Sequence, residues 1–255
     1  MSKITNNVVC IKWGTKFDSN YVNRLYKMVK KNLTIPFRFV CFTDDKTGID
    51  IGKTGKGIEC FDLPPIKFDT NTPERGWRKL SVFNKQLADL EGTALCLDID
   101  MIIINNIDYL FQESGEFRIM KDWGFPENVD IGASSIYRFE IGKHSDILDY
   151  FEKHFDEIRQ QVRNEQEYLS IKMKEKGILQ YWRRDIALSF PHGCIPIFPL
   201  NFILKPKKPT NPNVKILLFH GNPLPQEAIN GYLSFKRPQR TCRKTEWLKE
   251  FIYDN

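Results

Sequence analysis

Two carboxylates, Asp98 and Asp100, stand one residue apart inside an otherwise apolar run over residues 94–104. Residues 95–97 have the pattern of a short strand buried on both faces, and residues 102–104 resume it. Burying an ionised carboxylate costs several kcal/mol unless a cation or hydrogen-bond donors replace its water. Ligands of open α/β sheets bind at the carboxyl ends of strands, so this position favours a divalent metal that carries a phosphorylated ligand.

A purely structural role explains the same two residues equally well. Asp98 would then cap the turn that follows the strand, and Asp100 would pair with a lysine on the surface. The choice between a metal and a turn therefore depends on the elements around these carboxylates.

Length and composition indicate a globular protein with a full core. The 255 residues are 41% hydrophobic, which suits one large α/β domain or a domain with an appendage. The polar start and the short apolar run over residues 8–11 do not form a signal peptide, and no run approaches the roughly 18 apolar residues of a membrane span. The six cysteines are widely spaced and contain no CxxC pair, which predicts free, buried thiols and a cytoplasmic location.

The net charge of +6 is concentrated near the C-terminus. Lysines occupy positions 205, 207 and 208, and five basic residues lie between Lys236 and Lys244. Such charge would attract a nucleotide diphosphate, an anionic glycolipid or an acidic membrane, although solvation is the simpler explanation. The sequence has no nucleic-acid-binding motif, so we expect no nucleic-acid partner.

Strands alternate with helices through the first half of the chain. Strands are expected over residues 8–12, 37–42, 58–63 and 95–97. One amphipathic helix follows Asp18, and a second carries Trp77, Leu80, Phe83, Leu87 and Leu90 on one face. This alternation predicts an α/β fold with a mainly parallel sheet flanked by helices.

The second half predicts two strands, two helices and an irregular proline-rich segment. The strands cover residues 117–121 and 129–137, the helices 147–158 and 165–174, and the irregular segment 195–213. A buried strand over residues 214–219 then ends at His220 and Gly221, and a terminal helix covers residues 244–252.

These residues together resemble a known family. Asp98-Ile99-Asp100 after a hydrophobic strand resembles the DxD motif of GT-A-fold glycosyltransferases that use nucleotide sugars. Its usual companions occur in the usual order over residues 7–225, namely Trp13-Gly14-Thr15, Trp77-Arg78-Lys79-Leu80, Asn164-Glu165-Gln166 and Phe219-His220-Gly221. The last element is similar to the His-Gly element of the glycogenin and lipopolysaccharide galactosyltransferase group.

The resemblance implies a single GT-A (Rossmann-like) domain with a small C-terminal mixed α/β region. Residues 7–104 would form the nucleotide-binding half and residues 105–225 the sugar and acceptor half. Residues 226–255 would form a basic C-terminal segment and helix. The implied reaction is the transfer of a sugar from a nucleotide donor, most simply UDP-linked, to a hydroxyl of a glycan or glycolipid.

The resemblance also implies a metal site. Asp98 and Asp100 would supply oxygen ligands for Mn²⁺ or Mg²⁺, with Asp100 binding directly and Asp98 binding through water or holding the ribose. His220 would complete the shell, and its imidazole favours Mn²⁺ over Mg²⁺.

Further residues would bind the nucleotide sugar. Trp13, Gly14 and Thr15 would face the base and ribose. Ile99 of the DxD motif and Gly221 of the His-Gly element would also bind the nucleotide sugar. Arg78 and Lys79 would contact the phosphates or the sugar, and Asp44 and Asp45 are candidates for the base, although they also suit an ordinary turn.

The sugar side follows the same resemblance. Ser134 and Ser135 would lie beneath the sugar, where small side chains leave room. Glu165 and Gln166 would lie beside the transferred sugar and serve catalysis with Asp100. In structural terms, the serines equally suit a tightly packed strand, and Glu165 suits the first turn of a helix.

One departure from the family concerns the diphosphate. The lysine expected after the His-Gly element is absent, and Leu224 stands near that position. Lys205, Lys207, Lys208 or Arg240 would have to supply the charge. The His-Gly element favours a retaining enzyme, but a fold alone does not fix that outcome.

Other classes fit less well. A haloacid dehalogenase phosphatase would place Thr or Val where Ile102 stands, and a polymerase-beta-type nucleotidyltransferase would need a Gly-Ser helix start that the chain lacks. A catalytically silent carbohydrate- or partner-binding module with the same fold stays open.

The apolar stripe of the terminal helix has two interpretations. Trp247, Leu248, Phe251 and Ile252 would make peripheral contact with a membrane that carries a lipid-linked acceptor, or would pack on the domain. Packing is the commoner role of such a stripe.

Overall fold

The computed structural model describes residues 5–54, 56–69, 71–122, 124–126 and 128–253. The chain forms two compact units, each assembled from segments that are distant in the sequence. The first unit contains residues 1–22, 36–98 and 110–182, and the second contains residues 23–35, 99–109 and 183–255. The sequence analysis expected one domain divided into regions at residues 104 and 225, and this division stays a prediction.

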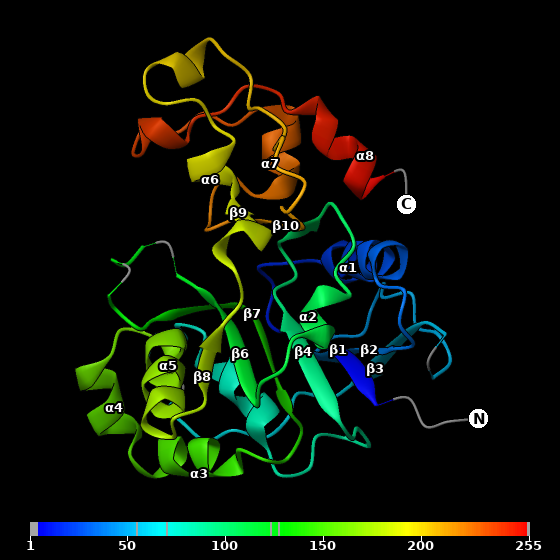
Figure 1. Ribbon diagram of the computed structural model, residues 1–255, viewed down its shortest axis with the longest axis vertical. Coiled ribbons are helices and arrows are strands. Elements are labelled where there is room, and N and C mark those ends of the chain that lie inside the picture. The colour runs from blue at the N-terminus through cyan, green and yellow to red at the C-terminus, as the bar shows by residue number, and fades with distance from the viewer. Residues whose placement is uncertain (1–4, 55, 70, 123, 127, 254–255) are drawn as a thin grey trace. The chain divides into compact units, whose positions relative to one another are not determined.

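The first unit is built on a seven-stranded sheet with the order β3-β2-β1-β4-β7-β6-β8 (Figure 1). Strands β3, β2, β1 and β4 are parallel, β7 is antiparallel to both β4 and β6, and β8 is parallel to β6. The predicted, mainly parallel sheet is therefore confirmed. The strands are β1 (Asn6–Lys12), β2 (Arg38–Thr43), β3 (Ile58–Phe61), β4 (Thr93–Leu97), β6 (Phe117–Lys121), β7 (Gly132–Glu140) and β8 (Leu179–Tyr181).

The strand register brings several chain segments to one edge of this sheet. At the ends of β1 and β2, Lys12 pairs with Thr43. Because β7 is antiparallel to β4, its first residues lie beside the end of β4, where Leu97 pairs with Ile136. The segments after β1, β2 and β4 and the start of β7 therefore share an edge, which we call the carboxyl edge.

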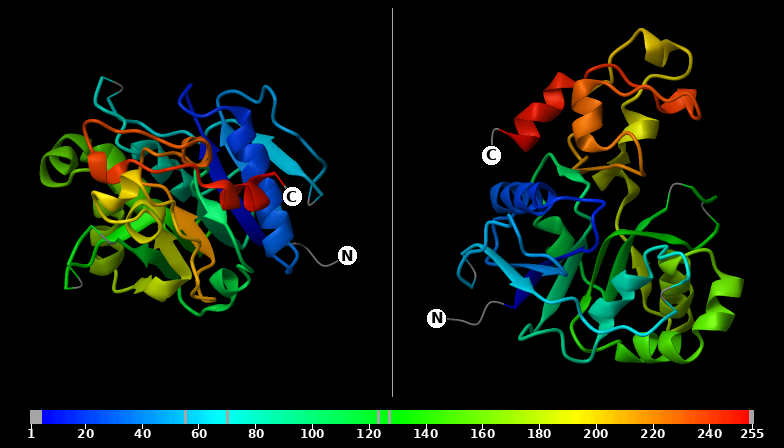
Figure 2. Two further views of the ribbon diagram at one scale, coloured as in Figure 1. Left: turned by 90° about the horizontal axis from the view of Figure 1, so that it is seen from above. Right: turned by 180° about the vertical axis from the view of Figure 1, so that it is seen from behind.

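Four helical segments of the first unit lie together beside the sheet: η1 (Trp77–Phe83), α3 (Ser145–Lys153), α4 (Phe155–Gln161) and α5 (Glu165–Glu175). Helix α5 packs on β7 and β8, and η1 packs against α3 and α5. The view from behind in Figure 2 shows η1 in front of the sheet with α3 to α5 next to it. A short helix α2 (Tyr109–Gln112) precedes β6.

Helix α1 (Ser19–Asn32) begins in the first unit and continues in the second. Its start agrees with the predicted cap, because the Asn20 N–H donates to Asp18 Oδ1 at 3.0 Å. The predicted apolar face is also present, and Val22, Leu25 and Val29 are completely buried.

The predicted helix from Trp77 to Leu90 is wrong in type and length. Only residues 77–83 are helical, in a 3-10 conformation, and the chain becomes extended at Asn84, whose Nδ2 donates to the carbonyls of Pro65 and Ser81. Leu87 and Leu90 are nevertheless buried. The apolar spacing thus correctly identified residues that face the core. It did not identify the backbone conformation, because turns can bury these side chains as well as a helix can.

Other predicted boundaries also shift. The strand expected over residues 129–137 covers 132–140 instead, and the helix expected over 147–158 is divided into α3 and α4 at His154. The sequence patterns missed short elements, namely β8, β9 (Ala187–Ser189), α2, α6 (Phe190–Gly193) and α7 (Pro225–Asn230).

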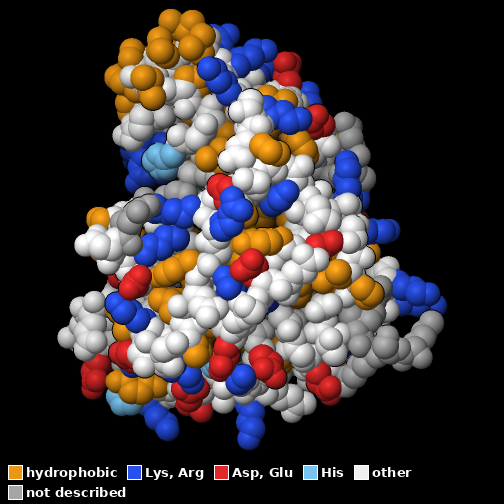
Figure 3. Space-filling model, in the orientation of Figure 1, with side chains coloured by type: hydrophobic (Ala, Val, Ile, Leu, Met, Phe, Trp, Pro, Cys, Tyr) orange, Lys and Arg blue, Asp and Glu red, His pale blue; other side chains and the backbone are white. Residues whose placement is uncertain are grey.

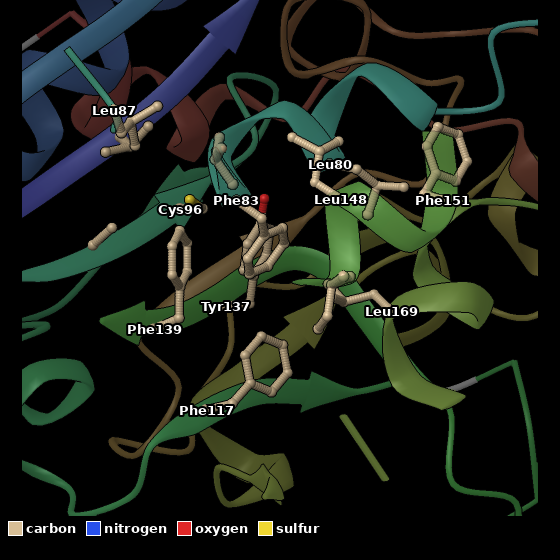
Figure 4. Packing of buried hydrophobic residues seen from close by; sticks show 14 of the residues in the cluster. Leu80, Phe83, Leu87, Cys96, Phe117, Tyr137, Phe139, Leu148, Phe151 and Leu169 are labelled. Atoms are coloured by element: carbon tan, nitrogen blue, oxygen red, sulfur yellow. The ribbon is translucent and has the colours of Figure 1, made fainter. Parts of the chain in front are cut away.

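Aromatic side chains form the centre of the first unit's core (Figure 4). The Phe83 ring lies 4.5 Å from that of Phe139 and 6.1 Å from that of Tyr137, so η1 is fixed to β7. Trp77, expected in the core, is buried and lies 5.5 Å from Phe151 of α3. This packing holds η1 in place above the sheet.

The second unit has its own three-stranded sheet, β5-β10-β9. Strand β5 (Ile102–Ile103) does resume after the two carboxylates, but it pairs antiparallel with β10 (Ile216–Leu218) and takes no part in the larger sheet. Strand β10 is parallel to β9. The remaining helical turns are η2 (Arg184–Ile186), η3 (Leu200–Phe202), η4 (Pro238–Arg240), η5 (Glu246–Leu248) and α8 (Lys249–Ile252).

The terminal helix expected over residues 244–252 is shorter than predicted: it consists of the 3-10 turn η5 followed by α8, and both pack within the second unit. Leu248 and Ile252 are buried, and the Trp247 indole N–H donates to the carbonyl of Pro206 at 3.1 Å. Its apolar side chains therefore serve folding, as the commoner interpretation expects. Among the described residues, no helix is both long and apolar enough to cross a membrane.

We predict that Phe83→Ala lowers the free energy of unfolding by about 3–5 kcal/mol, because it opens a cavity between η1 and β7. Phe235→Ala is the matched control, since the Phe235 side chain is 88% exposed, and it should change stability by less than about 0.5 kcal/mol. Urea denaturation followed by circular dichroism measures both values. Equal effects of the two substitutions would contradict this account of the core.

Candidate active site

Asp98 lies at the carboxyl edge, directly after β4, and forms an ion pair with Lys79 of η1. Lys79 Nζ is 2.5 Å from Asp98 Oδ1, and the two side chains are 19% and 26% exposed. The Asp98 N–H also donates to the carbonyl of Ser135 at 3.0 Å, which fixes the backbone against β7. The cation expected beside this carboxylate is thus supplied, in part, by the chain itself.

A second carboxylate, Glu165, faces the same lysine. Glu165 is the first residue of α5 and is buried, and its Oε1 lies 3.7 Å from Lys79 Nζ. Ser134 Oγ donates to Glu165 Oε1 at 2.5 Å. The structure therefore joins four predicted site residues, Lys79, Asp98, Ser134 and Glu165, in one cluster that we call the edge cluster.

Burial raises the pKa of Glu165 above its ordinary value. The positive charge of Lys79 and the hydrogen bond from Ser134 oppose this rise, whereas the negative charge of Asp98 adds to it. Two carboxylates thus share a single ammonium group. The edge cluster is short of positive charge when both carboxylates are ionised.

Gly76 makes room for the Glu165 carboxylate. Its φ of 81° lies in the left-handed region that glycine tolerates, and it immediately precedes η1. A Cβ at this position would collide with the carboxylate oxygens of Glu165. Glycine here thus allows η1 and the start of α5 to approach each other.

A cavity of about 20 Å³ lies below the edge cluster, between β1, β4 and β7. Its lining includes Lys79, Asp98, Ser134, Cys96 and Tyr137. This volume holds a water molecule and is too small for a nucleotide. Burial raises the pKa of Cys96 to about 12, so this thiol is protonated at neutral pH.

The turn after β1 is held by the turn after β2. Gly14 has a φ of 61° and is exposed, and its N–H donates to Asp44 Oδ2 at 2.9 Å. Asp45 instead accepts from the Thr47 N–H, as in an ordinary turn. Trp13, Gly14 and Thr15 therefore lie at the carboxyl edge, and Asp44 positions their turn.

Gln166 is positioned by a residue that the sequence analysis missed. Its Nε2 donates to Asp122 Oδ2 at 2.6 Å, and Asp122 directly follows β6. Asp122 follows a strand as Asp98 does, but that strand contains Arg118 and Lys121, so the signal in the sequence is weaker than at Asp98. Asn164 caps α5 by accepting from the Glu167 N–H, which sets the position of Glu165 and Gln166.

Arg78 has different partners from its neighbour Lys79. Its backbone N–H donates to Glu74 Oε1, its guanidinium lies 3.7 Å from Glu74, and it is above the ring of Phe68. Of the two predicted phosphate contacts, only Lys79 belongs to the edge cluster.

The His-Gly element lies in the second unit, as do Ile99 and Asp100. Gly221 has a φ of 78°, and Arg240 Nη1 donates to the carbonyls of His220 and Asn222. Lys205 and Lys208 pair with Glu246 and Glu250 instead. Among the basic residues considered as substitutes for the missing lysine, the structure thus places Arg240 at this element.

We predict that Glu165 makes folding pH-dependent. In the unfolded chain the pKa of Glu165 is about 4.3, and in the folded protein it is higher. The folded protein therefore binds more protons between these two pKa values, so the free energy of unfolding falls as pH rises through this interval. The unfolding free energy of the wild type relative to Glu165→Gln should therefore decrease from pH 4 toward neutrality. Chemical denaturation of both proteins at several pH values, without added metal, measures this difference. A constant or rising difference would refute the assignment.

We also predict that Gly76→Ala costs more stability than Gly177→Ala. Both glycines have a left-handed φ, but a Cβ at Gly177 meets no atom within 4 Å. Gly177→Ala should cost about 1–2 kcal/mol for the backbone alone. Gly76→Ala should cost at least about 1 kcal/mol more, because the Glu165 carboxylate must move. Equal losses in thermal denaturation would show that this contact is not tight.

Solved glycosyltransferases have similar structures. The galactosyltransferase LgtC, in complex with donor and acceptor sugar analogues, matches with a TM-score of 0.58 at 14% identity, over 86% of this chain and 88% of that chain. A second LgtC structure, of an active-site mutant in which glutamate replaces a glutamine, matches with a TM-score of 0.57 at 14% identity, over 86% and 89%.

The glycosyltransferase GlyE of Streptococcus pneumoniae TIGR4 matches with a TM-score of 0.62 at 13% identity, over 97% of this chain and 61% of that chain. No protein-family model matches the sequence, and no curated protein matches it significantly. At these identities the similarity establishes the architecture. The chain therefore has the mixed α/β fold of these glycosyltransferases, as the GT-A resemblance predicted.

Proposed function

We propose that this protein is a metal-dependent glycosyltransferase that moves a sugar from a UDP-linked donor to a hydroxyl of a glycan or glycolipid. The observation that carries the proposal is the edge cluster, in which Asp98, Glu165 and Lys79 meet at the carboxyl edge of a sheet with a glycosyltransferase fold. Ligands of such sheets bind at this edge. In the reaction, the bond from the anomeric carbon to the diphosphate oxygen would break and its electron pair would leave with the diphosphate, while the acceptor oxygen would bond to the anomeric carbon and release its proton to the solvent.

The charge of the edge cluster supports a bound cation. Lys79 is shared by Asp98 and Glu165, and the Asp98 charge contributes to the raised pKa of Glu165. A cation at Asp98 would relieve this repulsion. Lys79 Nζ is near Oδ1 of Asp98, and a carboxylate accepts at both oxygens, so Oδ2 adds a ligand for a metal.

The metal would be held by Asp98, Asp100 and His220, and it would neutralise the departing diphosphate. The described residues contain no group of three or more His, Cys, Asp or Glu side chains arranged to hold an ion. Mg²⁺ and similar ions are also bound by one or two carboxylates together with substrate phosphates, so two carboxylates suit a site completed by the donor. An imidazole ligand from His220 would favour Mn²⁺.

The remaining residues would bind and orient the donor. Trp13, Gly14 and Thr15 would face the base and ribose, supported by the hydrogen bond from Gly14 to Asp44. Lys79, with Arg78 next to it, would bind phosphate oxygens in exchange for its carboxylate partners. Ile99, within the DxD motif, and Gly221, within the His-Gly element, would also contribute to the nucleotide-sugar site.

The sugar would lie against the start of β7 and the start of α5. Ser134 and Ser135 offer small side chains there, and Glu165 and Gln166 would hold the sugar hydroxyls next to Asp100. The LgtC structure with a glutamine replaced in its active site supports a role for Gln166. The His-Gly element supports transfer with retention, and the six free cysteines, five of them buried, support a cytoplasmic enzyme.

We predict that the protein binds UDP in a Mn²⁺-dependent manner and that Asp100→Ala abolishes this binding. Calorimetric titrations with UDP, GDP and CDP, each with and without Mn²⁺, identify the base. Asp149→Ala is the matched control, because Asp149 is an exposed carboxylate on α3. It should leave nucleotide affinity unchanged.

The outcomes separate the alternatives. Binding of one nucleotide that needs both Mn²⁺ and Asp100 would support a donor site, and turnover assays with nucleotide sugars would follow. Lack of metal-linked binding to all three nucleotides would overturn the proposal in favour of a silent carbohydrate- or partner-binding module, or of a purely structural role for Asp98 and Asp100.

A further inference from the structure

A run of large apolar side chains is exposed on the second unit, in the segment that follows α6. We call residues 197–204 the apolar loop. Figure 3 shows hydrophobic side chains gathered over this segment at the top of the view, with Lys and Arg side chains beside them. The exposed side chains are Ile197 (78%), Phe198 (54%), Leu200 (45%), Phe202 (41%), Ile203 (71%) and Leu204 (45%).

The base of the apolar loop is firmly held. Asn201 is completely buried, and its Nδ2 donates to the carbonyls of Pro238 and Thr241, both at 2.8 Å. The rings of Phe198 and Phe202 pack edge to face at 5.9 Å. The exposed side chains are thus displayed by an anchored backbone. A contiguous apolar surface of this kind indicates a binding surface.

Arginines surround the apolar loop. Arg237 and Arg240 line a cavity of about 350 Å³ together with Ile197 and Phe198, and Arg243 Nη1 donates to the carbonyl of Phe202 at 3.3 Å. Guanidinium groups bind phosphate oxygens through paired hydrogen bonds. Apolar side chains and phosphate-binding groups therefore adjoin each other on one surface.

The net charge of residues 183–255 is positive, in agreement with the arginines found beside the apolar loop. Residues 183–255 contain 12 Lys or Arg and 5 Asp or Glu, a net charge of +7, whereas the entire chain carries +6. The rest of the chain therefore has a net charge of −1. A positive surface of this size attracts anionic partners and repels a second copy of itself.

We propose that the apolar loop and its arginines form a docking surface for a bilayer that contains anionic phospholipids. Ile197, Phe198 and Ile203 would enter the boundary between head groups and acyl chains, and Arg237 and Arg240 would lie at the level of the phosphates. Lipid phosphate would enter the cavity that the loop and the arginines share. This surface differs from the terminal helix, whose Leu248 and Ile252 are buried.

Vesicle co-sedimentation tests the proposal with the full chain and without any nucleotide. The protein should bind vesicles of phosphatidylcholine with phosphatidylglycerol much more tightly than vesicles of phosphatidylcholine alone, and 0.5 M salt should weaken the binding. Ile197→Ser with Phe198→Ser should reduce the partition coefficient at least about tenfold. The matched control is Ile51→Ser with Ile171→Ser, which removes exposed apolar side chains of the first unit (56% and 38% exposed) and should retain binding.

A second pair of variants tests the charge. Lys236→Gln with Arg237→Gln should weaken binding roughly thirtyfold, because each basic residue near an anionic surface contributes about 1 kcal/mol. Lys53→Gln with Lys56→Gln, on an exposed loop of the first unit, is the control. Thermal denaturation confirms that all four variants fold.

Several results would overturn the proposal. These are failure of the wild type to bind anionic vesicles, or equal binding by the apolar-loop variant and its control. Size-exclusion chromatography with light scattering provides a further test. If the wild type is oligomeric and Ile197→Ser with Phe198→Ser makes it monomeric, the surface covers a second copy and the membrane assignment is wrong. Since no turnover is measured, failure here leaves the proposed transferase function unaffected.

Discussion

The first unit depends on how it accommodates charge at the carboxyl edge of a buried sheet. Asp98 directly follows β4, whose residues 94–97 are buried, and Glu165 is itself buried. Desolvation of these two carboxylates is tolerated because Lys79 of η1 lies within reach of both. A single ammonium group only partly compensates two carboxylates, so the edge cluster carries an excess of negative charge when both carboxylates are ionised.

Much of the surrounding architecture positions these three side chains. The aromatic contacts of Phe83 fix η1, and therefore Lys79, to β7. Gly76 lets η1 approach α5, and the Asn164 cap defines where α5, and therefore Glu165, begins. Strand β7 contributes Ser134 because it runs antiparallel to β4 and so starts at the edge where β4 ends. Elements far apart in the sequence thus converge on one small cluster.

The two units differ in the charge that they carry and in the surface that they expose. The first unit has the larger sheet and the edge cluster, in which carboxylates exceed cations. The second unit has most of the excess positive charge, and it exposes an apolar loop on an anchored base. Its arginines act in two ways: Arg240 supports the His-Gly element through backbone carbonyls, and Arg237 faces the cavity beside the loop. Backbone contacts of this kind explain how an arginine distant in sequence is brought to an element that lacks its expected lysine.

The sequence by itself determined the strands β1, β2 and β4, the helix α1 with its Asp18 cap, and the position of Asp98 at a strand end, because period and capping are local properties. It could not determine that only residues 77–83 form a 3-10 helix and that turns follow up to Leu90, since apolar spacing indicates burial and not the path of the backbone. Only the tertiary structure decided that Lys79 pairs with Asp98 and Glu165 while its neighbour Arg78 pairs with Glu74, and that Asp122 holds Gln166. The pairings of Lys79 and Gln166 depend on the packing of η1 and α5 against strands that lie many residues away, and no local pattern encodes those distances, whereas Arg78 and Glu74 are only four residues apart.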